Sequence, residues 1–517
     1  MRAVIVAVAT CVAALLLTPH ALAASSPQAL WLDPSGRPSA SAWDALRLLS
    51  EAPADGLAAA DYGAANLAEH AAILHAAASA STLSTRAAFE GGLDSAMQRY
   101  LRDLRTGRVD PRSVGFRIPH SPDAAPDFAA LLGSATAQQR LPRLVAELRP
   151  RTAQYTRLRE ALARYRDLAV DRSFVRLSAA VPVRPGDAFD DAAALHRLLV
   201  ALGDLPSDAA LSANQYDAAL AQGVMHFQGR HGLPADGVIG RATLTALNVP
   251  LAQRVQQLEL ALERLRWLPE FDAGRFIGIN IPMFRLWAWD KAQPAAAPVS
   301  MAVVVGKALN TRTPVLAESM RYLIIRPYWN VPRSILTHEL LPAIARDSGY
   351  LQRNDMEIVH GAGDDARAVT ASAENVALLR QGTLRVRQRP GAKNSLGLVK
   401  FIFPNDDNVY LHDTPATQLF GQARRDFSHG CVRLEDPVAL AEWVLNDQPQ
   451  WTRHRIEQAM VGSMSLRVNL SRPIPVILFY MTAMVMPSDQ TLHFAPDIYG
   501  HDATLLRALK NPRPAPR

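Results

Sequence analysis

The chain has almost no cysteine: only Cys11 and Cys431 occur in 517 residues. Cys11 lies in a segment with the features of an export signal, which are a short basic start, an apolar stretch at 3–17 and a small-x-small cleavage site at 21–23. We therefore expect residues 1–23 to be removed, which leaves no partner for an internal disulfide. In an exported protein a single remaining thiol either pairs between chains or is kept for its reactivity.

Long hydrophobic runs and strong charge of one sign are lacking too. The apolar stretch at 3–17 is shorter than the roughly 20 residues that a membrane span needs, and no later run is long enough. We expect a periplasmic protein without a membrane span. The net charge of +7 is modest for this length and spread along the chain, which disfavours nucleic acid and suits a protein beside an anionic polymer.

A chain of this length with 49% hydrophobic residues predicts about three units. Residues 24–187 are alanine-rich with helical periodicity and predict a helical scaffold domain without chemistry of its own. Residues 251–272 predict an amphipathic connecting helix with one buried face. Short β-branched runs then predict a mostly β unit over 273–465, and we expect the C-terminal segment 466–517 to pack on the scaffold or on this unit.

Residues 188–250 carry a local signature. The pairs Phe227-Gln228 and Gly232-Leu233, the loop at 236–240 and the run from Thr243 resemble the small three-helix peptidoglycan-binding domain. We expect a small core, which consists of Phe227, Leu233, Val238, Leu244 and Leu247, and an exposed Arg230. Wall binding and a spacer role both remain open for this module.

The remaining thiol lies in a reactive setting. Cys431 belongs to the run FSHGCVRL at 427–434, and upstream His412 ends the strand-like run NVYLH. Acyl transfer at an amide needs a thiolate, a base and N–H donors for the developing oxyanion. These residue types supply all three.

The same residues resemble the L,D-transpeptidase (YkuD-type) family, in which a histidine and an SHGC motif meet at the end of a β-sandwich. Further runs resemble its large periplasmic YcbB-like branch; they are PYWNVP at 327–332, PGAKNSLG at 390–397, KFIFPN at 400–405 and HDTP at 412–415. The resemblance implies a multidomain α+β protein with a β-sandwich catalytic domain and a helical lid insertion at 334–385. It also implies peptidoglycan stem peptides as partners, carbapenem-type β-lactams as inhibitors and no cofactor.

The resemblance assigns Cys431 as nucleophile and favours His412 as base. His429 is the competing base, because alternate residues of an extended segment face the same way. A histidine base predicts a titration near neutrality. Gly430 permits close backbone approach, and the Cys431 amide with Tyr410 forms the expected oxyanion hole. We expect a backbone carbonyl, rather than the Asp413 side chain, to orient His412.

Four residues are expected to bind substrate. Arg433 suits a substrate carboxylate, with a structural ion pair as the alternative. The resemblance adds Ser428 and Asn394, and Trp329 lines the groove or belongs to a hinge-side core. Asp436 before Pro437 predicts a helix N-cap.

The implied reaction cleaves a tetrapeptide stem, releases D-alanine and forms a 3→3 cross-link. Three alternatives remain. An L,D-carboxypeptidase or hydrolase shares the same acyl-enzyme, and a noncatalytic wall-binding protein uses the module alone. A zinc site is the third, from His412, His429, Cys431 and a carboxylate, but the spacing is tight for metal ligands and we expect none. The sequence does not determine the acyl acceptor or the oligomeric state.

Overall fold

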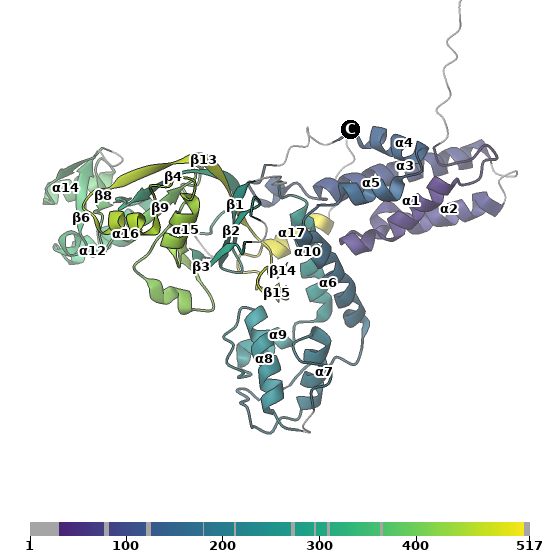
Figure 1. Cartoon of the computed structure of the whole chain (residues 1–517), viewed down its shortest axis with the longest axis horizontal. Coiled ribbons are helices and arrows are strands. Elements are labelled where there is room, and N and C mark those ends of the chain that lie inside the picture. The colour runs from purple at the N-terminus through teal and green to yellow at the C-terminus, as the bar shows by residue number, and fades with distance from the viewer. Residues whose placement is uncertain are drawn as a thin grey trace, which may run out of the picture.

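The computed structural model describes residues 30–76, 82–119, 126–178, 180–210, 214–269, 274–293, 296–307, 311–361 and 366–510. The expected signal peptide, with Cys11, lies outside the described residues. In Figure 1 the N-terminal helices lie at one end, a β-rich domain lies toward the other, and a three-helix module hangs below their junction. Within these ranges no helix is long and apolar enough to cross a bilayer.

The N-terminal residues are helical, as predicted. Polar side chains cap several helices, as when Ser39 accepts from the Ala42 N–H and Asp127 from two N–H groups. The elements are α1 (Ala40–Ser50), η1 (Ala52–Asp55), η2 (Ala59–Tyr62), α2 (Ala64–Ala76), α3 (Leu83–Thr106), η4 (Pro111–Val114), α4 (Phe128–Ala137), α5 (Leu141–Leu148) and α6 (Ala153–Val170). α1 to α5 share one core around Trp31 and Phe89, whereas α6 buries its apolar face in a separate cluster with the next domains.

The three-helix module consists of α7 (Ala192–Leu202), α8 (Ala218–Arg230) and α9 (Arg241–Leu247). Phe227 fills its core, while the neighbouring Gln228 holds the following loop by donating to Asp236 at 2.9 Å and accepting from the Gly237 N–H at 2.9 Å. Gly237 has φ +70°, a conformation that suits glycine. The expected core needs two corrections: Leu233 and Val238 are only half-buried and lie outside the module's core cluster. Ile239 is fully buried instead of Val238, because the strand-like bridge to Val183 turns its side chain inward.

Arg230 also differs from its prediction. Its side chain is buried and pairs through two nitrogens with Asp204, which is itself fully buried and also contacts His226. The Arg230 Nη1 reaches the Leu492 carbonyl at 3.3 Å, so it joins the module to the C-terminal part of the chain. Arg230 is therefore a structural residue.

Removing Arg230 leaves Asp204 as a buried, poorly compensated charge. We expect Arg230→Ala to lower the free energy of unfolding by about 3–5 kcal/mol, measured by urea titration of the full chain. Arg143→Ala is the matched control, because Arg143 forms an exposed pair with Glu147 that contributes at most about 1 kcal/mol. Equal losses in the two variants would contradict this assignment.

The connecting helix α10 (Leu251–Leu265) is buried more completely than predicted. Its C-terminal half has no exposed face: Glu263 and Arg264 are buried along with the leucines. It packs against α6 on one side and against β14 (Ala483–Val485) and α17 (His501–Lys510) on others. The polar residues find partners, since Arg264 pairs with Asp502 at 2.5 Å and Glu263 with Arg266 at 3.0 Å. The helix therefore packs between the scaffold helix α6 and the C-terminal elements.

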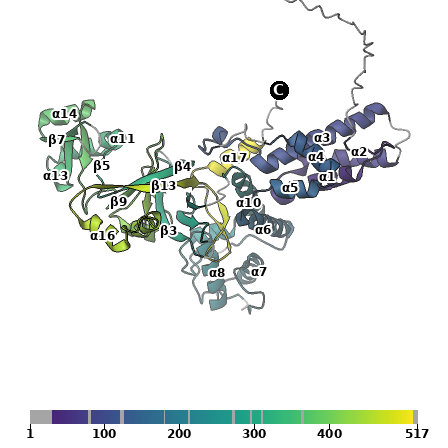
Figure 2. The ribbon, with the colours of Figure 1, turned by 45° about the horizontal axis from the view of Figure 1, so that its top comes forward.

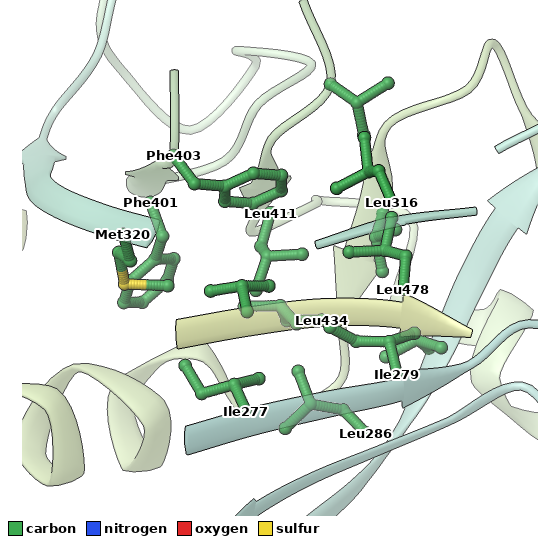
Figure 3. Close-up of a cluster of buried hydrophobic side chains, with 14 of the residues drawn as sticks. Ile277, Ile279, Leu286, Leu316, Met320, Phe401, Phe403, Leu411, Leu434 and Leu478 are labelled. Atoms are coloured by element: carbon green, nitrogen blue, oxygen red, sulfur yellow. The ribbon is translucent and has the colours of Figure 1, made fainter. Parts of the chain in front are cut away.

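The β-rich domain closes its main sheet on itself. Eight strands pair in the ring order β3-β12-β10-β9-β4-β13-β1-β2 and back to β3. Their bounds are β1 (Arg275–Asn280), β2 (Arg285–Asp290), β3 (Val299–Gly306), β4 (Leu316–Ile325), β9 (Val399–Ile402), β10 (Leu411–His412), β12 (Val432–Leu434) and β13 (Leu466–Phe479). A short strand, β11 (Asp426–Ser428), pairs with β3 beside this ring. The expected sandwich is thus a closed sheet whose walls face each other across one core, which Figure 3 shows around Phe401, Leu411 and Leu478.

The insertion (residues 329–388) lies at the far end of this domain from the scaffold (Figure 2). Its helical elements are α11 (Arg333–Ile335), η6 (Leu336–Leu340), α12 (Leu341–Arg346), α13 (Tyr350–Arg353) and α14 (Ala373–Gln381). A four-stranded sheet, which the sequence did not predict, joins them; its strands are β5 (Trp329–Asn330), β6 (Met356–His360), β7 (Arg367–Val369) and β8 (Arg385–Gln388). Strands this short and charged carry little periodic signal. The insertion has its own apolar core.

The C-terminal segment contributes strand β13 to the main sheet, while its later elements pack on the scaffold, with β14 against α6 and α17 against η4. β13 lies between β4 and β1, and a hairpin of β14 and β15 (Leu492–Phe494) and helix α17 follow. Before β13 come η7 (Thr417–Gly421), α15 (Pro437–Val444) and α16 (Arg453–Val461). Asp436 caps α15 by accepting from the Ala439 N–H at 2.9 Å, as predicted.

Candidate active site

The site lies on the outward face of strands β10 and β12. These strands pair in parallel with Leu411 opposite Val432 and His412 opposite Arg433. Leu411 and Val432 are fully buried in the core. Because side chains alternate along a strand, Tyr410, His412, Cys431 and Arg433 share the opposite face. Lys400 of β9 pairs with His412 and joins them there.

The Cys431 thiol is half-buried and contacts Tyr410. Its Sγ also lies 3.8 Å from the Asn408 carbonyl oxygen. Burial raises the pKa of the thiol, while hydrogen bonds from Tyr410 and the charges of Arg433 and Lys400 act in the opposite direction. The Cys431 N–H has no hydrogen-bond partner among the described residues, so it is open to a ligand oxygen.

His412 is buried and oriented by a backbone carbonyl, as expected. Its Nδ1 lies 2.5 Å from the Asp413 carbonyl oxygen. The Asp413 carboxylate is engaged elsewhere, since it accepts from the Leu398 and Thr414 N–H groups at 2.7 Å each. Burial, followed by the charge of Arg433, lowers the pKa of His412 to about 3. The expected titration near neutrality is therefore not supported: the ring is neutral across the neutral range.

Buried polar groups fix the SHGC turn through hydrogen bonds. Ser428 Oγ donates to the Cys431 carbonyl at 2.5 Å and accepts from the Gly430 N–H at 3.1 Å. The Gly430 carbonyl accepts from the buried Thr313 hydroxyl at 2.7 Å, and Gly430 itself has φ +111°. Ser428 thus shapes the turn, and its hydroxyl is already engaged within it.

Arg433 has no acidic partner among the described residues. Burial lowers its pKa, and its buried Nε has no hydrogen-bond partner. The alternative of a structural ion pair with Asp or Glu is therefore not observed. A guanidinium in this setting suits an incoming carboxylate.

Residues 274–468, which contain this site, match the family model of the L,D-transpeptidase catalytic domain (YkuD). The chain carries an L,D-transpeptidase catalytic domain. Residues 23–162 match a scaffold domain, and residues 190–247 match a "Putative peptidoglycan binding domain". A Haemophilus influenzae (strain ATCC 51907 / DSM 11121 / KW20 / Rd) protein named "Putative L,D-transpeptidase" is 31% identical over 247 residues. These residues are 48% of this chain and 48% of that protein, so the chain spans about half the length of the curated relative it matches.

Within the transpeptidase domain, His429 faces the insertion. Its Nε2 lies 2.7 Å from Glu339 Oε1, on η6. The two residues are 90 positions apart, and this contact joins the insertion to the SHGC motif. His429 is thus engaged by a carboxylate, whereas His412 shares the face of Cys431.

Two predicted substrate residues of the transpeptidase domain make structural contacts instead. Asn394 is buried, and its amide donates to the carbonyls of Pro327 and Arg389 while its oxygen accepts from the Leu396 N–H. It shapes the loop whose Leu396 carbonyl contacts His412. Trp329 packs against the core of the insertion, which favours the hinge-side alternative.

Several site residues of the transpeptidase domain were missed by the sequence analysis. Lys400 lies in the run KFIFPN, which supported the family resemblance, so this motif could have identified it as a site residue. Thr313, Glu339 and Tyr499 reach the site only through contacts distant in sequence; Tyr499 Oη, for example, donates to the Gly306 carbonyl at 2.6 Å and accepts from the Thr313 N–H at 3.2 Å. Among the described residues, no group of three or more His, Cys, Asp or Glu is placed to hold a metal ion.

Proposed function

We propose that this chain is a periplasmic peptidoglycan L,D-transpeptidase that forms 3→3 cross-links through a cysteine acyl-enzyme. The observation that carries the proposal is the shared face of β10 and β12. It presents a half-buried thiol, a neutral buried histidine and an arginine that has no acidic partner among the described residues. The matched catalytic and peptidoglycan-binding families support this substrate class. The pattern of residues 1–23, which has the features expected of an export signal, supports the compartment.

The reaction proceeds in two acyl-transfer steps. Cys431 loses its proton to His412, and its sulfur attacks the carbonyl between the third-position diamino acid and D-alanine of a tetrapeptide stem. The developing oxyanion accepts from the Cys431 N–H and the Tyr410 hydroxyl. The amide C–N bond breaks, the proton passes to the leaving nitrogen, and D-alanine departs with a thioester left on Cys431.

The second step regenerates the enzyme. The side-chain amine of another stem attacks the thioester, its proton goes to His412, and the thiol is released as the new amide forms. The insertion acts as a lid, joined to the motif by Glu339 and His429. By the same logic, carbapenem-type β-lactams acylate Cys431 because their strained carbonyl accepts the same sulfur.

The test is incubation of the purified protein with disaccharide-tetrapeptide muropeptides, followed by mass spectrometry. A cross-linked dimer that has lost one D-alanine is the expected product. Conversion to tripeptide alone would make the protein an L,D-carboxypeptidase, with water as the acceptor. No conversion and no thioester on Cys431 would overturn the proposal.

Arg433 offers a prediction on substrate binding. If its guanidinium holds a substrate carboxylate, Arg433→Gln should raise KM for the tetrapeptide roughly 10- to 100-fold, since a hydrogen bond to a charged group contributes about 1.5–3 kcal/mol. Arg472→Gln is the control, because Arg472 is exposed on β13. An unchanged KM with lowered kcat would instead place Arg433 in transition-state stabilisation.

A further inference from the structure

A cavity that none of the active-site residues lines lies where three parts of the chain meet. It has a volume of about 460 Å³. One wall is α6, another is the module around the end of α7 and the last turns of α8, and the third is the hairpin of β14 and β15. Figure 1 shows these three elements converging at the junction above the module. This volume lies in the range of small-molecule sites.

The α6 wall presents positive charge. Arg157, Glu160, Ala161, Arg164 and Tyr165 line the cavity with the spacing of one helical face. Arg157 is half-buried and has no hydrogen-bond or ion-pair partner among the described residues. Arg164 reaches across to the module, where its Nη2 donates to the Ala201 carbonyl at 2.5 Å. Glu160 is the single acid among the lining residues.

The module wall is preorganised by one buried carboxylate. Asp204 holds Arg230 through two nitrogens and holds His226 Nδ1 at 2.7 Å. Both side chains line the cavity, four residues apart on α8. Since Nδ1 of His226 is engaged by Asp204, its Nε2 remains for another partner, and the side chain is 48% exposed.

The hairpin wall supplies neutral polar and apolar groups. Gln490, Thr491 and Leu492 line the cavity beside Val485. The turn is fixed by Asp489, which accepts from the Thr491 N–H at 2.8 Å and from its hydroxyl at 2.7 Å. A rigid rim of this kind presents hydrogen-bonding groups without a large ordering cost.

We propose that this cavity binds a carboxylate-bearing peptidoglycan fragment, held jointly by the scaffold helix, the module and the C-terminal hairpin. Arg157 and Arg164 against the single lining acid Glu160 favour an anion, since Asp204 already balances the charge of Arg230. The apolar side chains suit the methyl groups of stem-peptide alanines. The choice of peptidoglycan rests on the proposed function, whereas the preference for a carboxylate rests on the cavity itself. The module then supplies only part of the binding site, and the scaffold helix and the C-terminal hairpin supply the rest.

The test uses the full chain with Cys431→Ser, so that a disaccharide-tetrapeptide muropeptide is bound without turnover. Isothermal titration compares this protein with its Arg157→Glu and Arg143→Glu derivatives; Arg143 is an exposed scaffold arginine outside the cavity. We expect Arg157→Glu to weaken a binding event by tenfold or more and Arg143→Glu to leave it unchanged. Amide exchange should show protection of residues 490–492 on adding the muropeptide.

Further arms identify the ligand chemistry. A muropeptide with amidated carboxyl groups and a neutral N-acetylglucosamine tetramer should both bind at least tenfold more weakly. If Arg157→Glu binds the muropeptide as tightly as the parent protein, or if residues 490–492 gain no protection, the cavity is not the binding site. Displacement by inorganic phosphate at equal concentration would overturn its assignment to peptidoglycan. Acylation of the wild-type thiol by a carbapenem is measured separately, so failure of the proposed function is distinguishable from failure of this site.

Discussion

Replacing Cys431 by serine is expected to abolish cross-linking and to leave no carbapenem adduct detectable by intact-protein mass spectrometry, while wild type gains one adduct per chain. The physical reason is the nucleophile itself: a serine hydroxyl on this face has a neutral histidine beside it but is far less readily ionised than a thiol. The larger desolvation of an alkoxide adds to the barrier.

The fold of this variant should be preserved. Cys431 is half-buried, its side chain contacts Tyr410 and the Asn408 carbonyl, which serine can also reach, and serine is slightly smaller. Far-UV circular dichroism and the urea midpoint are therefore expected to match wild type. An adduct of wild-type yield on Cys431→Ser would show that another residue is the nucleophile.

The second large effect concerns the base. A positioned general base contributes about 10²- to 10⁴-fold, so His412→Ala should slow carbapenem acylation of Cys431 by that order in stopped-flow measurements. His429→Gln is the matched control and should cost less than about tenfold, because His429 contacts Glu339 of the insertion. A larger loss for His429→Gln would transfer the base role to His429.

The pH profile gives an independent reading of the same assignment. The neutral form of His412 is the base, and its pKa is lowered to about 3, so the competent form is already complete at pH 5. We expect the wild-type acylation rate to be nearly flat between pH 5 and 8. In His412→Ala the rate should instead rise with pH, because only the thiolate fraction reacts and the pKa of the thiol is raised. A wild-type acid limb near pH 6.5 would contradict a buried neutral His412.

The sequence predicted the parts of the site that are local. The thiol, the SHGC turn and the strand ending in His412 are contiguous runs, and the alternation of side chains then places them on one face. The Phe227-Gln228 pair was similarly readable, because the glutamine binds a loop only eight residues away. In motifs of this kind the interacting residues are close in sequence, so the motif itself predicts how they are arranged in space.

The remaining features depend on contacts that no local pattern encodes. Thr313 supports Gly430 across 117 positions, and Glu339 meets His429 across 90. β13 was not assigned as a strand because Pro473 and Pro475 interrupt it, and proline is disfavoured in a central strand. The structure accommodates Pro473 where the register with β4 shifts, between Asn469 and Ile474, whereas Pro475 lies opposite Ser319 of β4 beyond the shift. The burial of Arg230 depended on Asp204, 26 residues earlier.

The position of β13 has a consequence for the order of events in biosynthesis. The ring closes only when residues 466–479 enter between β4 and β1, and these residues follow the nucleophile by 35 positions or more. A chain that emerges N-terminus first therefore exposes Cys431 before its sheet can be completed. A fragment that ends near residue 468, where the family match ends, lacks most of the closing strand. A closed sheet around this site thus requires nearly the full-length chain.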